Sequence, residues 1–244
     1  ITWLGGTHVI IPGFRPDLAL EVIERERVTA TLLIPTMINF LIHHPDVKAR
    51  DLSTLRCIAY GGAPMPAELA RQAMQTLTCS FIHLYGLTES APLLTFLPPE
   101  EHVADGPPEK VRRLLSCGRE VIGVRVRVVN TEGREVAPGE VGEIIAKGPN
   151  NMVGYWNKPQ ETADALRDGW LYTGDLATVD DEGYIYIVDR KKDMIITGGE
   201  NVFSTEVENV LYTHPAILEA AVVGVPDATW GEAIKAIVVL KPGM

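Results

Sequence analysis

The sequence has 244 residues, of which 46% are hydrophobic and 22% charged, so its composition is ordinary for a globular protein and its length exceeds the usual single domain. The formal net charge of −10 argues against an electrostatic nucleic-acid interface, and lysine and arginine form no stripe interleaved with aromatic residues. No apolar run approaches the roughly 20 residues of a membrane-spanning helix. We therefore expect a cytoplasmic protein with no membrane span and no nucleic-acid partner.

The two ends of the sequence are abrupt. The chain begins at Ile1 in an apolar stretch and ends at Met244 just after a predicted strand. The first stretch has no helix cap or polar lead-in, and the last lacks the helix or strands that would close a small α/β domain. We expect a chain truncated at both ends, whose exposed sheet edges could pair with a second copy in a homo-oligomer.

Short β-branched runs alternate with helical patterns from residue 8 to residue 85, which predicts part of a doubly wound parallel sheet in an α/β fold. Parallel strands buried on both faces read as continuous apolar runs, and residues 30–34 form one. Asp17 is the expected N-cap of the first helix, and Pro66 stands where a first helical turn tolerates proline. The expected strands are 8–11, 30–35, 55–60 and 80–85, and the expected helices are 17–27, 36–43 and 66–77.

The hydrophobic period changes to two in the second half of the chain. A polar, proline-rich stretch over residues 98–113 predicts a surface connection between the two patterns. Alternating segments separated by glycine-containing turns then predict a small antiparallel, barrel-like sheet. The alternating segments are 124–129, 142–147 and 184–188, and the turns are 130–133 and 180–183.

A different arrangement is expected after Arg190. A hairpin over 194–202 precedes a helix from Ser204 to about Thr213, and two strands follow at 220–225 and 233–240. We place a domain boundary near Lys192. The expected domains are a large one over 1–191, with its parallel sheet in about 1–95 and its β-rich region in about 116–191, and a small, incomplete α+β domain over 192–244.

Glycine-marked loops follow two of the expected parallel strands. Ligands gather at the carboxyl ends of the strands in an open parallel sheet, so these loops are expected to face one pocket. The residues concerned are Gly61, Gly62, Ala63 and Pro64 in the first loop, and Gly86, Leu87, Thr88 and Glu89 in the second.

Two charged residues are expected at strand ends further along. Asp175 follows Thr173-Gly174 at a predicted turn, and Arg190 ends an apolar alternation. A carboxylate and a guanidinium suit a sugar diol beside a phosphate. As isolated residues, they would most often form a surface ion pair that contributes little.

Thr88 and Glu89 place a hydroxyl and a carboxylate on one loop. A hydroxyl can contact phosphate, and a carboxylate is a hard oxygen ligand of the kind that Mg²⁺ prefers. A lone Thr-Glu pair is also a common helix-start cap. Its position after a buried strand and Tyr85-Gly86 favours the ligand role.

Three stretches together carry a family resemblance. These are YGLTES at 85–90, GEVGEIIAKGPNNMVGY at 139–155, and the segment 168–208 with its motifs YTGDL and VDRKKD. In this order they resemble the adenylate-forming superfamily, most closely its AMP-forming acyl-CoA synthetases. The resemblance implies a ligase that uses ATP and Mg²⁺ to turn a carboxylic acid into an acyl-adenylate, and then transfers the acyl group to CoA.

The resemblance covers essentially the whole chain but only the middle and later part of a complete synthetase. The family's phosphate loop would precede Ile1, and its adenylation lysine would follow Met244. Neither Lys235 nor Lys241 stands in the context of that lysine. We therefore expect the parent to be an acid-thiol ligase and this chain alone to be inactive.

The resemblance also implies roles for single residues. Tyr85 would stack on adenine, Thr88 would contact phosphate, and Glu89 would bind Mg²⁺, with Thr88 and Glu89 taken as catalytic. Asp175 would hold the ribose hydroxyls and Arg190 the ribose and phosphate. The remaining nucleotide-binding positions would be Gly61, Gly62, Ala63, Pro64 and Gly86.

Lys192 resembles the family's hinge, where backbone rotation would carry the small domain from an adenylating to a thioester-forming pose. Gly198, Gly199, Glu200 and Trp230 resemble the family's CoA-binding positions. The glycine pair is also compatible with a plain hairpin turn, and Trp230 with packing over the core of the small domain.

The acyl substrate is less constrained. The apolar side chains of Met37, Ile38, Leu93 and Leu94 favour a fatty or aryl acid. One alternative is an amino-acid-activating domain that loads a carrier protein, which the text KKDMIITGGENVFSTEVE disfavours. A second alternative is a noncatalytic nucleotide-binding or purely structural fragment.

Overall fold

The structure is a computed structural model that describes residues 3, 5–241 and 243. It divides into two compact units. Unit 1 contains Ile1–His83 and Pro98–Leu114, and unit 2 contains Leu84–Leu97 and Leu115–Met244. In the part of the chain that is described, no helix is both long and apolar enough to cross a membrane.

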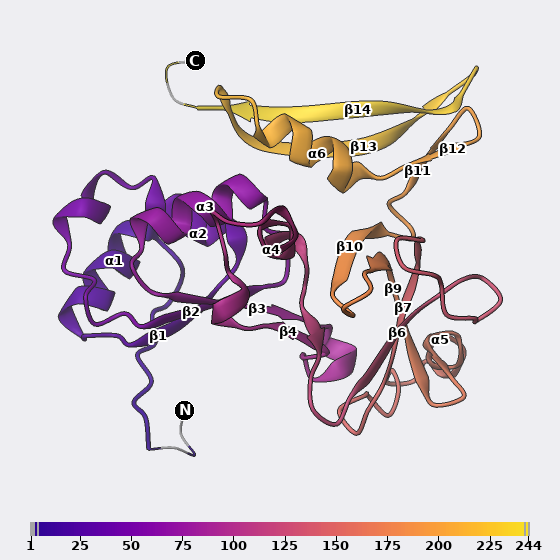
Figure 1. The fold of residues 1–244 in the computed structure, drawn as a ribbon, viewed down its shortest axis with the longest axis horizontal. Helices are drawn as coiled ribbons and strands as arrows, with labels where there is room; N and C mark the ends of the chain where they lie inside the picture. Colours follow the sequence, from indigo (N-terminus) through magenta and orange to yellow (C-terminus); the bar gives the residue numbers. More distant parts are fainter. Residues whose placement is uncertain (1–2, 4, 242, 244) are drawn as a thin grey trace. The chain divides into compact units, whose positions relative to one another are not determined.

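Unit 1 is built from alternating helices and strands (Figure 1), and its buried apolar side chains form one core. Strands β1 and β2 are parallel, and the sheet continues from β2 to β3. Ile38, Ile58 and Tyr60 are fully buried in the core. The elements are α1 (Pro16–Arg25), β1 (Ala30–Leu33), α2 (Pro35–Ile42), β2 (Cys57–Gly61), α3 (Ala67–Thr76) and β3 (Ser80–Tyr85).

Three details of this part differ from the sequence predictions. Residues 8–11 form no strand, because their apolar side chains find no core, and Ile10 is 87% exposed. Arg15 rather than Asp17 is the N-cap of α1, since Pro16 takes the first helical position, where its fixed φ suits the helix. Pro66 is likewise the N-cap of α3 and not part of its first turn.

The segment Pro98–Leu114 is more than a surface connection. It contains 3-10 turns at Pro99–Glu101 and Arg113–Leu115 and the short helix α4 (Pro108–Arg112). Arg113 is 9% exposed and donates to Glu101 at 2.7 Å. Most of residues 98–113 are nevertheless exposed, as expected of a surface connection, and Arg113 is the buried exception.

Unit 2 holds an antiparallel sheet of order β10-β9-β7-β6, which matches the predicted change of hydrophobic period. Val128, Ile144, Ala177 and Ile185 form its core. The elements are β4 (Thr95–Leu97), β5 (Arg119–Glu120), β6 (Arg125–Val129), β7 (Gly142–Lys147), α5 (Pro159–Ala165), β8 (Leu166–Arg167), β9 (Trp170–Val179) and β10 (Ile185–Arg190).

The last elements of unit 2 form a four-stranded sheet of order β12-β11-β14-β13, and helix α6 lies along β13 (Figure 1). The two long strands were predicted shorter than they are, and only residues 228–230 separate them. The elements are β11 (Ile195–Thr197), β12 (Glu200–Val202), α6 (Ser204–Tyr212), β13 (Ile217–Asp227) and β14 (Gly231–Leu240).

The turn predicted at Thr173-Gly174-Asp175 is wrong. All three residues lie inside β9, and Asp175 is paired with Arg190 of β10. The pairing of β9 with β7 shifts register between Glu143 and Ile145, and Gly174 has a φ of +75°. A bulge therefore re-aims the side chains here while the strand continues on both sides of it.

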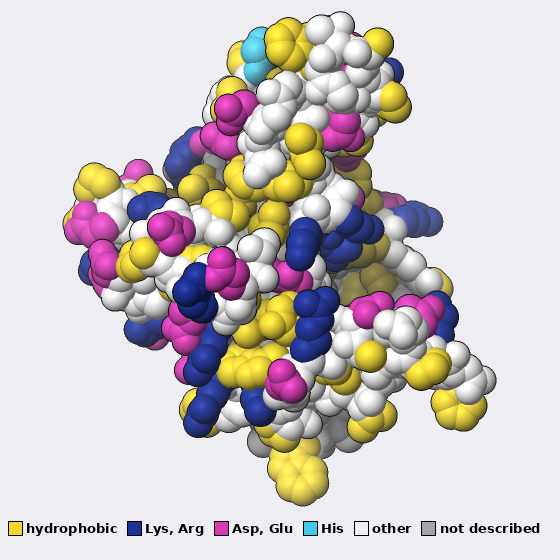
Figure 2. Space-filling model, turned by 90° about the vertical axis from the view of Figure 1, so that its right-hand side faces the viewer, with side chains coloured by type: hydrophobic (Ala, Val, Ile, Leu, Met, Phe, Trp, Pro, Cys, Tyr) yellow, Lys and Arg dark blue, Asp and Glu magenta, His cyan; other side chains and the backbone are white. Residues whose placement is uncertain are grey.

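The predicted fold class is confirmed. The chain is a mixed α/β structure with parallel winding, a curled antiparallel sheet and a small C-terminal α+β region. Charged side chains of both signs are interspersed with hydrophobic ones on the face shown in Figure 2.

Candidate functional site

A cavity of about 700 Å³ opens in unit 2 and is lined by four separate segments of the chain. Its lining residues come from loops, from β9 and from the end of β10. The lining residues are Gly86, Leu87, Thr88, Glu89, Pro92, Tyr155, Leu171, Tyr172, Thr173, Gly174, Arg190, Lys191 and Lys192.

The loop after β3 closes on itself and presents its polar residues to the cavity. Ser90, not Thr88, makes the capping bonds, because its hydroxyl both accepts from the backbone N–H of Leu87 and donates to the carbonyl of Leu87 at 3.0 Å. A Cβ on Gly86 would lie 1.9 Å from the carbonyl oxygen of Pro92. Glycine is therefore required where the loop folds back.

The segment after β7 clamps this loop. The side-chain amide of Asn150 donates to the carbonyls of Ser90 and Leu93 at 2.7 and 2.9 Å. The backbone N–H of Met152 donates to the carbonyl of Glu89 at 2.7 Å. The hydroxyl of Tyr155 donates to Oε1 of Glu89, also at 2.7 Å. Glu89 is thus held at two points, its backbone carbonyl and its carboxylate.

Strand β7 holds the bulge of β9. The hydroxyl of Thr173 donates to the carbonyl of Ile144 at 2.8 Å and accepts from the backbone N–H of Asp175 at 3.1 Å. One oxygen of Glu143 accepts from the backbone N–H of Gly174, and the other contacts the ammonium of Lys191 at 3.0 Å. These bonds fix the backbone that carries Asp175.

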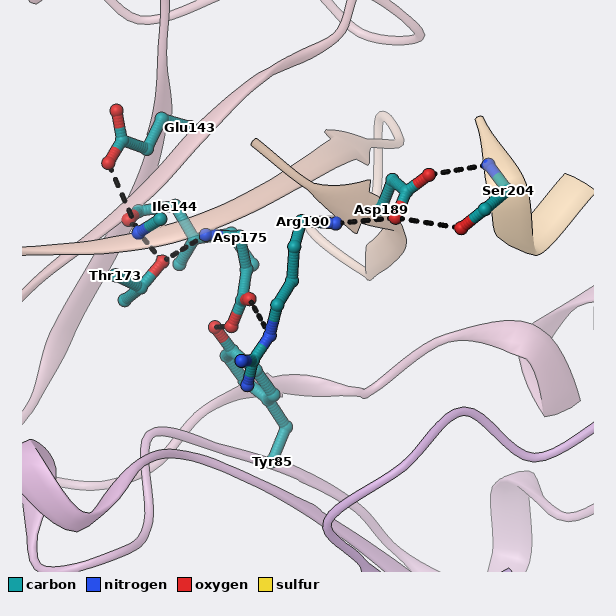
Figure 3. Close-up of polar contacts among 9 residues, drawn as sticks. Tyr85, Glu143, Ile144, Thr173, Asp175, Asp189, Arg190 and Ser204 are labelled. Carbon is teal, nitrogen blue, oxygen red and sulfur yellow. Dashed lines mark hydrogen bonds and ion pairs between the residues drawn. The ribbon is translucent and has the colours of Figure 1, made fainter. Parts of the chain in front are cut away.

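Asp175 is buried between Tyr85 and Arg190 (Figure 3). The hydroxyl of Tyr85 donates to Oδ2 of Asp175 at 2.8 Å, and Nε of Arg190 lies 3.4 Å from Oδ1. Asp175 is 5% exposed, whereas the side chain of Arg190 is 58% exposed. The guanidinium therefore reaches from a buried carboxylate to the surface of the cavity.

Burial dominates the electrostatics of this pair. It raises the pKa of Asp175 above its usual value, and the hydrogen bond from Tyr85 and the charge of Arg190 only partly oppose it. Burial also raises the pKa of Tyr85 well above its usual range, so the phenol stays a donor. Burial therefore disfavours the ionised form of Asp175, and a further hydrogen-bond donor would stabilise it.

The cavity wall combines cations with one carboxylate. Its charged lining residues are Arg190, Lys191, Lys192 and Glu89. A guanidinium and ammonium groups bind phosphate-like anions through charge-assisted hydrogen bonds, and a carboxylate can hold a hard cation beside such an anion. The arrangement suits an anionic ligand that carries its own divalent cation.

The structure brings together only part of the predicted site. Gly86, Thr88, Glu89, Arg190 and Lys192 line one cavity. Tyr85 and Asp175 lie buried next to Arg190. The predicted loop of Gly61, Gly62, Ala63 and Pro64 belongs to unit 1, and its role stays a prediction.

The predicted CoA-binding positions lie in the C-terminal part of unit 2. Gly198 and Gly199 form the turn between β11 and β12, both with positive φ, and Glu200 begins β12. Gly198 donates to the carbonyl of Trp230 at 2.9 Å, and a Cβ on it would lie 2.9 Å from that indole ring. Trp230 is 60% exposed, so it covers the turn rather than the core. Their relation to CoA stays a prediction.

Sequence reasoning missed several residues of the site. Tyr155 and Glu143 stand in the motif at 139–155, but the sequence predicted no role for them. It also predicted none for Lys191 and Thr173. Glu143 had one local signal, a carboxylate within an otherwise apolar strand. Tyr155 had none, because its partner Glu89 lies 66 residues earlier in the chain.

Comparison with known proteins finds relatives along nearly the whole chain. Residues 1–156 match the family model described as AMP-binding enzyme, and residues 206–244 match that of the AMP-binding enzyme C-terminal domain. The chain is 45% identical over 97% of its length to the medium/long-chain-fatty-acid–CoA ligase FadD8 of Mycobacterium tuberculosis, and covers 40% of that protein. It is also 45% identical over 98% of its length to a feruloyl-CoA synthase of Amycolatopsis sp., and covers 47% of it.

Two solved structures share the fold. The amide bond synthetase McbA of Marinactinospora thermotolerans matches with a TM-score of 0.87 and 39% identity, over 96% of this chain and 47% of that one. The anthranilate CoA ligase AuaEII in complex with anthranoyl-AMP matches with a TM-score of 0.87 and 30% identity, over 98% of this chain and 45% of that one. The chain thus spans less than half the length of these four relatives. It belongs to the AMP-binding enzyme family.

Proposed function

We propose that this chain is part of an AMP-forming acyl-CoA synthetase. The full-length protein would join a carboxylic acid to ATP, giving an acyl-adenylate and pyrophosphate, and CoA sulfur would then displace AMP to form a thioester. The observation that carries the proposal is the cavity lined by Glu89 and Arg190, with Asp175 buried behind the guanidinium. Relatives named as a medium/long-chain-fatty-acid–CoA ligase and a feruloyl-CoA synthase support it.

The buried anion of Asp175 is proposed to bind the ribose hydroxyls. Burial disfavours its ionised form and raises its pKa, so two further hydroxyl donors would stabilise the carboxylate. Arg190 would bridge the ribose and the α-phosphate, because its guanidinium extends from Asp175 into the cavity. Thr88, exposed on the same loop as Glu89, would contact phosphate.

Glu89 is proposed to help hold Mg²⁺. Mg²⁺ keeps several waters and binds through one or two carboxylates together with substrate phosphates. A single carboxylate bonded to Tyr155, in a cavity whose other charged lining residues are cations, fits that donor set. When bound, Mg²⁺ would neutralise phosphate charge, while Tyr155 and the backbone of Met152 keep Glu89 in place.

The second half-reaction is proposed to need movement of the C-terminal elements. Lys192 would be the hinge, and the domain boundary near this residue follows from that role. Lys192 is exposed in the turn between β10 and β11, where its neighbours supply the backbone hydrogen bonds. Gly198, Gly199, Glu200 and Trp230 would then approach CoA.

The substrate is proposed to be a fatty or aryl acid. This rests on the relatives, which are named for medium- and long-chain fatty acids and for ferulate. Two of the apolar residues that favoured such an acid in the sequence, Ile38 and Leu94, are fully buried in their cores. They pack the fold and cannot line an acyl pocket.

Pyrophosphate exchange by the full-length protein, with a panel of fatty and aryl acids, tests the proposal. Arg190→Ala should reduce exchange by about 100-fold or more, since one preorganised donor to a charged transition state contributes about that much. Arg134→Ala is the matched control, because Arg134 is exposed, is paired with Glu132 and does not line the cavity. It should leave exchange at the wild-type rate.

Each result separates the alternatives. Exchange that depends on an amino acid and not on a fatty or aryl acid would favour an amino-acid-activating domain that loads a carrier protein. No exchange with any acid, combined with measurable ATP binding, would favour a noncatalytic nucleotide-binding protein. Equal pyrophosphate exchange in Arg190→Ala and Arg134→Ala would show that Arg190 has no role in adenylation.

A further inference from the structure

We propose that Asp189 is a positioning residue that ties the segment carrying Arg190 to the first turn of helix α6. The inference rests on the proposed function, since it assigns a role in the adenylating pose of that same site. Nothing in the motifs pointed to Asp189 or to Ser204. Their relationship comes from the contacts alone (Figure 3).

The two side chains make a compact buried network. Oδ2 of Asp189 accepts from the backbone N–H of Ser204 at 2.5 Å, and Oδ1 accepts from the hydroxyl of Ser204 at 3.2 Å. Oδ1 also accepts from the backbone N–H of Arg190 at 2.7 Å. Asp189 is 5% exposed and Ser204 is 8% exposed, so water competes little for these bonds.

Asp189 serves α6 as an N-terminal cap supplied from another element. The first N–H groups of a helix have no partner within it, and a carboxylate near them is favoured by the helix dipole. The N-cap residue of α6, Phe203, makes no side-chain capping bond. The backbone N–H groups of Glu206 and Val207 bond to the carbonyl of Phe203, and Asp189 takes the N–H of Ser204.

A bulge in β10 sends Asp189 and Arg190 to different partners. The pairing of β10 with β9 shifts register between Ile187 and Asp189. Beyond the shift, Asp189 is buried against Ser204, whereas Arg190 is exposed and meets Asp175. Bulges commonly re-aim side chains next to active sites. Adjacent residues thus connect the candidate nucleotide site to α6.

The contact spans the proposed hinge. Asp189 precedes Lys192 and Ser204 follows it, and the two partners are 15 positions apart in the sequence. Rotation at Lys192 would move α6 relative to β10, so the Asp189–Ser204 bonds must break in any other pose. They therefore favour the observed pose, in which Arg190 is held beside Asp175, and they oppose departure from it.

Ser204→Pro removes the contact cleanly. Proline at the first helical position is tolerated because that N–H has no intrahelical partner, and it deletes both the N–H and the hydroxyl that Asp189 accepts. Phe203, with φ −88° and ψ 121°, already has the extended conformation that precedes proline. Ser204→Ala is the conservative variant, since it keeps the N–H.

The full-length protein allows the two half-reactions to be measured separately. We expect Ser204→Pro and Asp189→Asn to raise the KM for ATP in pyrophosphate exchange by roughly 5- to 20-fold, as expected for one charge-assisted hydrogen bond. Thioester formation from preformed acyl-adenylate should stay at the wild-type rate or rise. Ser204→Ala should retain most of the wild-type pyrophosphate exchange, because it keeps the backbone N–H. Asp180→Asn is the control, because Asp180 accepts two backbone N–H groups at the other end of β10.

Amide hydrogen exchange of this chain supplies a readout that does not depend on activity. Asp189→Asn should accelerate exchange at Ser204 and at Arg190 together, whereas Asp180→Asn should not. Unchanged exchange at Ser204 would overturn the proposal. It would also be overturned if both half-reactions fell equally in Ser204→Pro, in step with a lower melting temperature. If wild-type protein adenylates no acid, the proposed function fails, while the hydrogen-exchange result still decides the contact.

Discussion

The hydroxyl of Tyr85 lies 2.8 Å from Oδ2 of Asp175, and both residues are buried although 90 residues separate them in the chain. The phenol comes from the end of β3 and the carboxylate from the bulge of β9. Their hydrogen bond joins two motifs of the family in one contact. Its removal should therefore be felt in both stability and ligand binding.

Tyr85→Phe should lower the free energy of unfolding by about 1.5 to 3 kcal/mol, the usual contribution of a hydrogen bond to a buried charged group. It should also raise the pKa of Asp175 further, because the bond from Tyr85 opposes the effect of burial. Urea denaturation measures the first effect. Tyr212→Phe is the control, since its hydroxyl lies 3.5 Å from the carbonyl of Ala220. Equal losses in both variants would contradict the prediction.

Asp175 should make stability depend on pH. Because burial raises its pKa in the folded state above the usual 3.8, the folded protein binds more protons than the unfolded chain between 3.8 and the raised pKa. Its contribution to stability therefore falls as pH rises through that window and stays unfavourable above it.

Asp175→Asn should accordingly melt at a higher temperature than the wild type at neutral pH, and the difference should shrink as the pH falls through the window. The loss of the contact with Arg190 should matter little, because that side chain is 58% exposed. Asp105→Asn, at an exposed position in unit 1, should show no such trend. A neutral-pH melting temperature below that of the wild type would contradict the argument.

Gly86→Ala should disrupt the loop that carries Thr88 and Glu89. The new Cβ would lie 1.9 Å from the carbonyl oxygen of Pro92, so the backbone must move apart. We expect a loss of about 1 to 3 kcal/mol in the free energy of unfolding. Gly13→Ala, where no atom lies within 4 Å of the added Cβ, should cost far less. Chemical denaturation of the two variants provides the comparison.

Lys192→Pro in the full-length protein should separate the half-reactions. The backbone bonds of the turn come from the N–H groups of Lys191, Asp193 and Met194, so proline removes none of these donors. Its fixed φ should slow thioester formation while pyrophosphate exchange continues. Lys192→Ala separates loss of the side chain from loss of rotation. If alanine gave the same split, the ammonium group rather than the backbone would be responsible.

Much of the framework was determined by the sequence alone. Hydrophobic period placed β7 at its observed bounds and located the hairpin of β11 and β12 with its turn at Gly198-Gly199. It also separated the parallel winding from the antiparallel sheet. Period and turn chemistry report local conformation and burial, which each short segment largely sets for itself.

The tertiary structure alone decided which side chains meet. Thr173-Gly174-Asp175 reads as a turn, yet Glu143 and Ile144 of β7 hold it as a bulge within a strand. The bonds from Tyr155 to Glu89 and from Ser204 to Asp189 likewise have no local signal. Each depends on strand register and on bulges, which arise from pairing with residues distant in the chain, and a shift of one residue would turn every side chain to the other face.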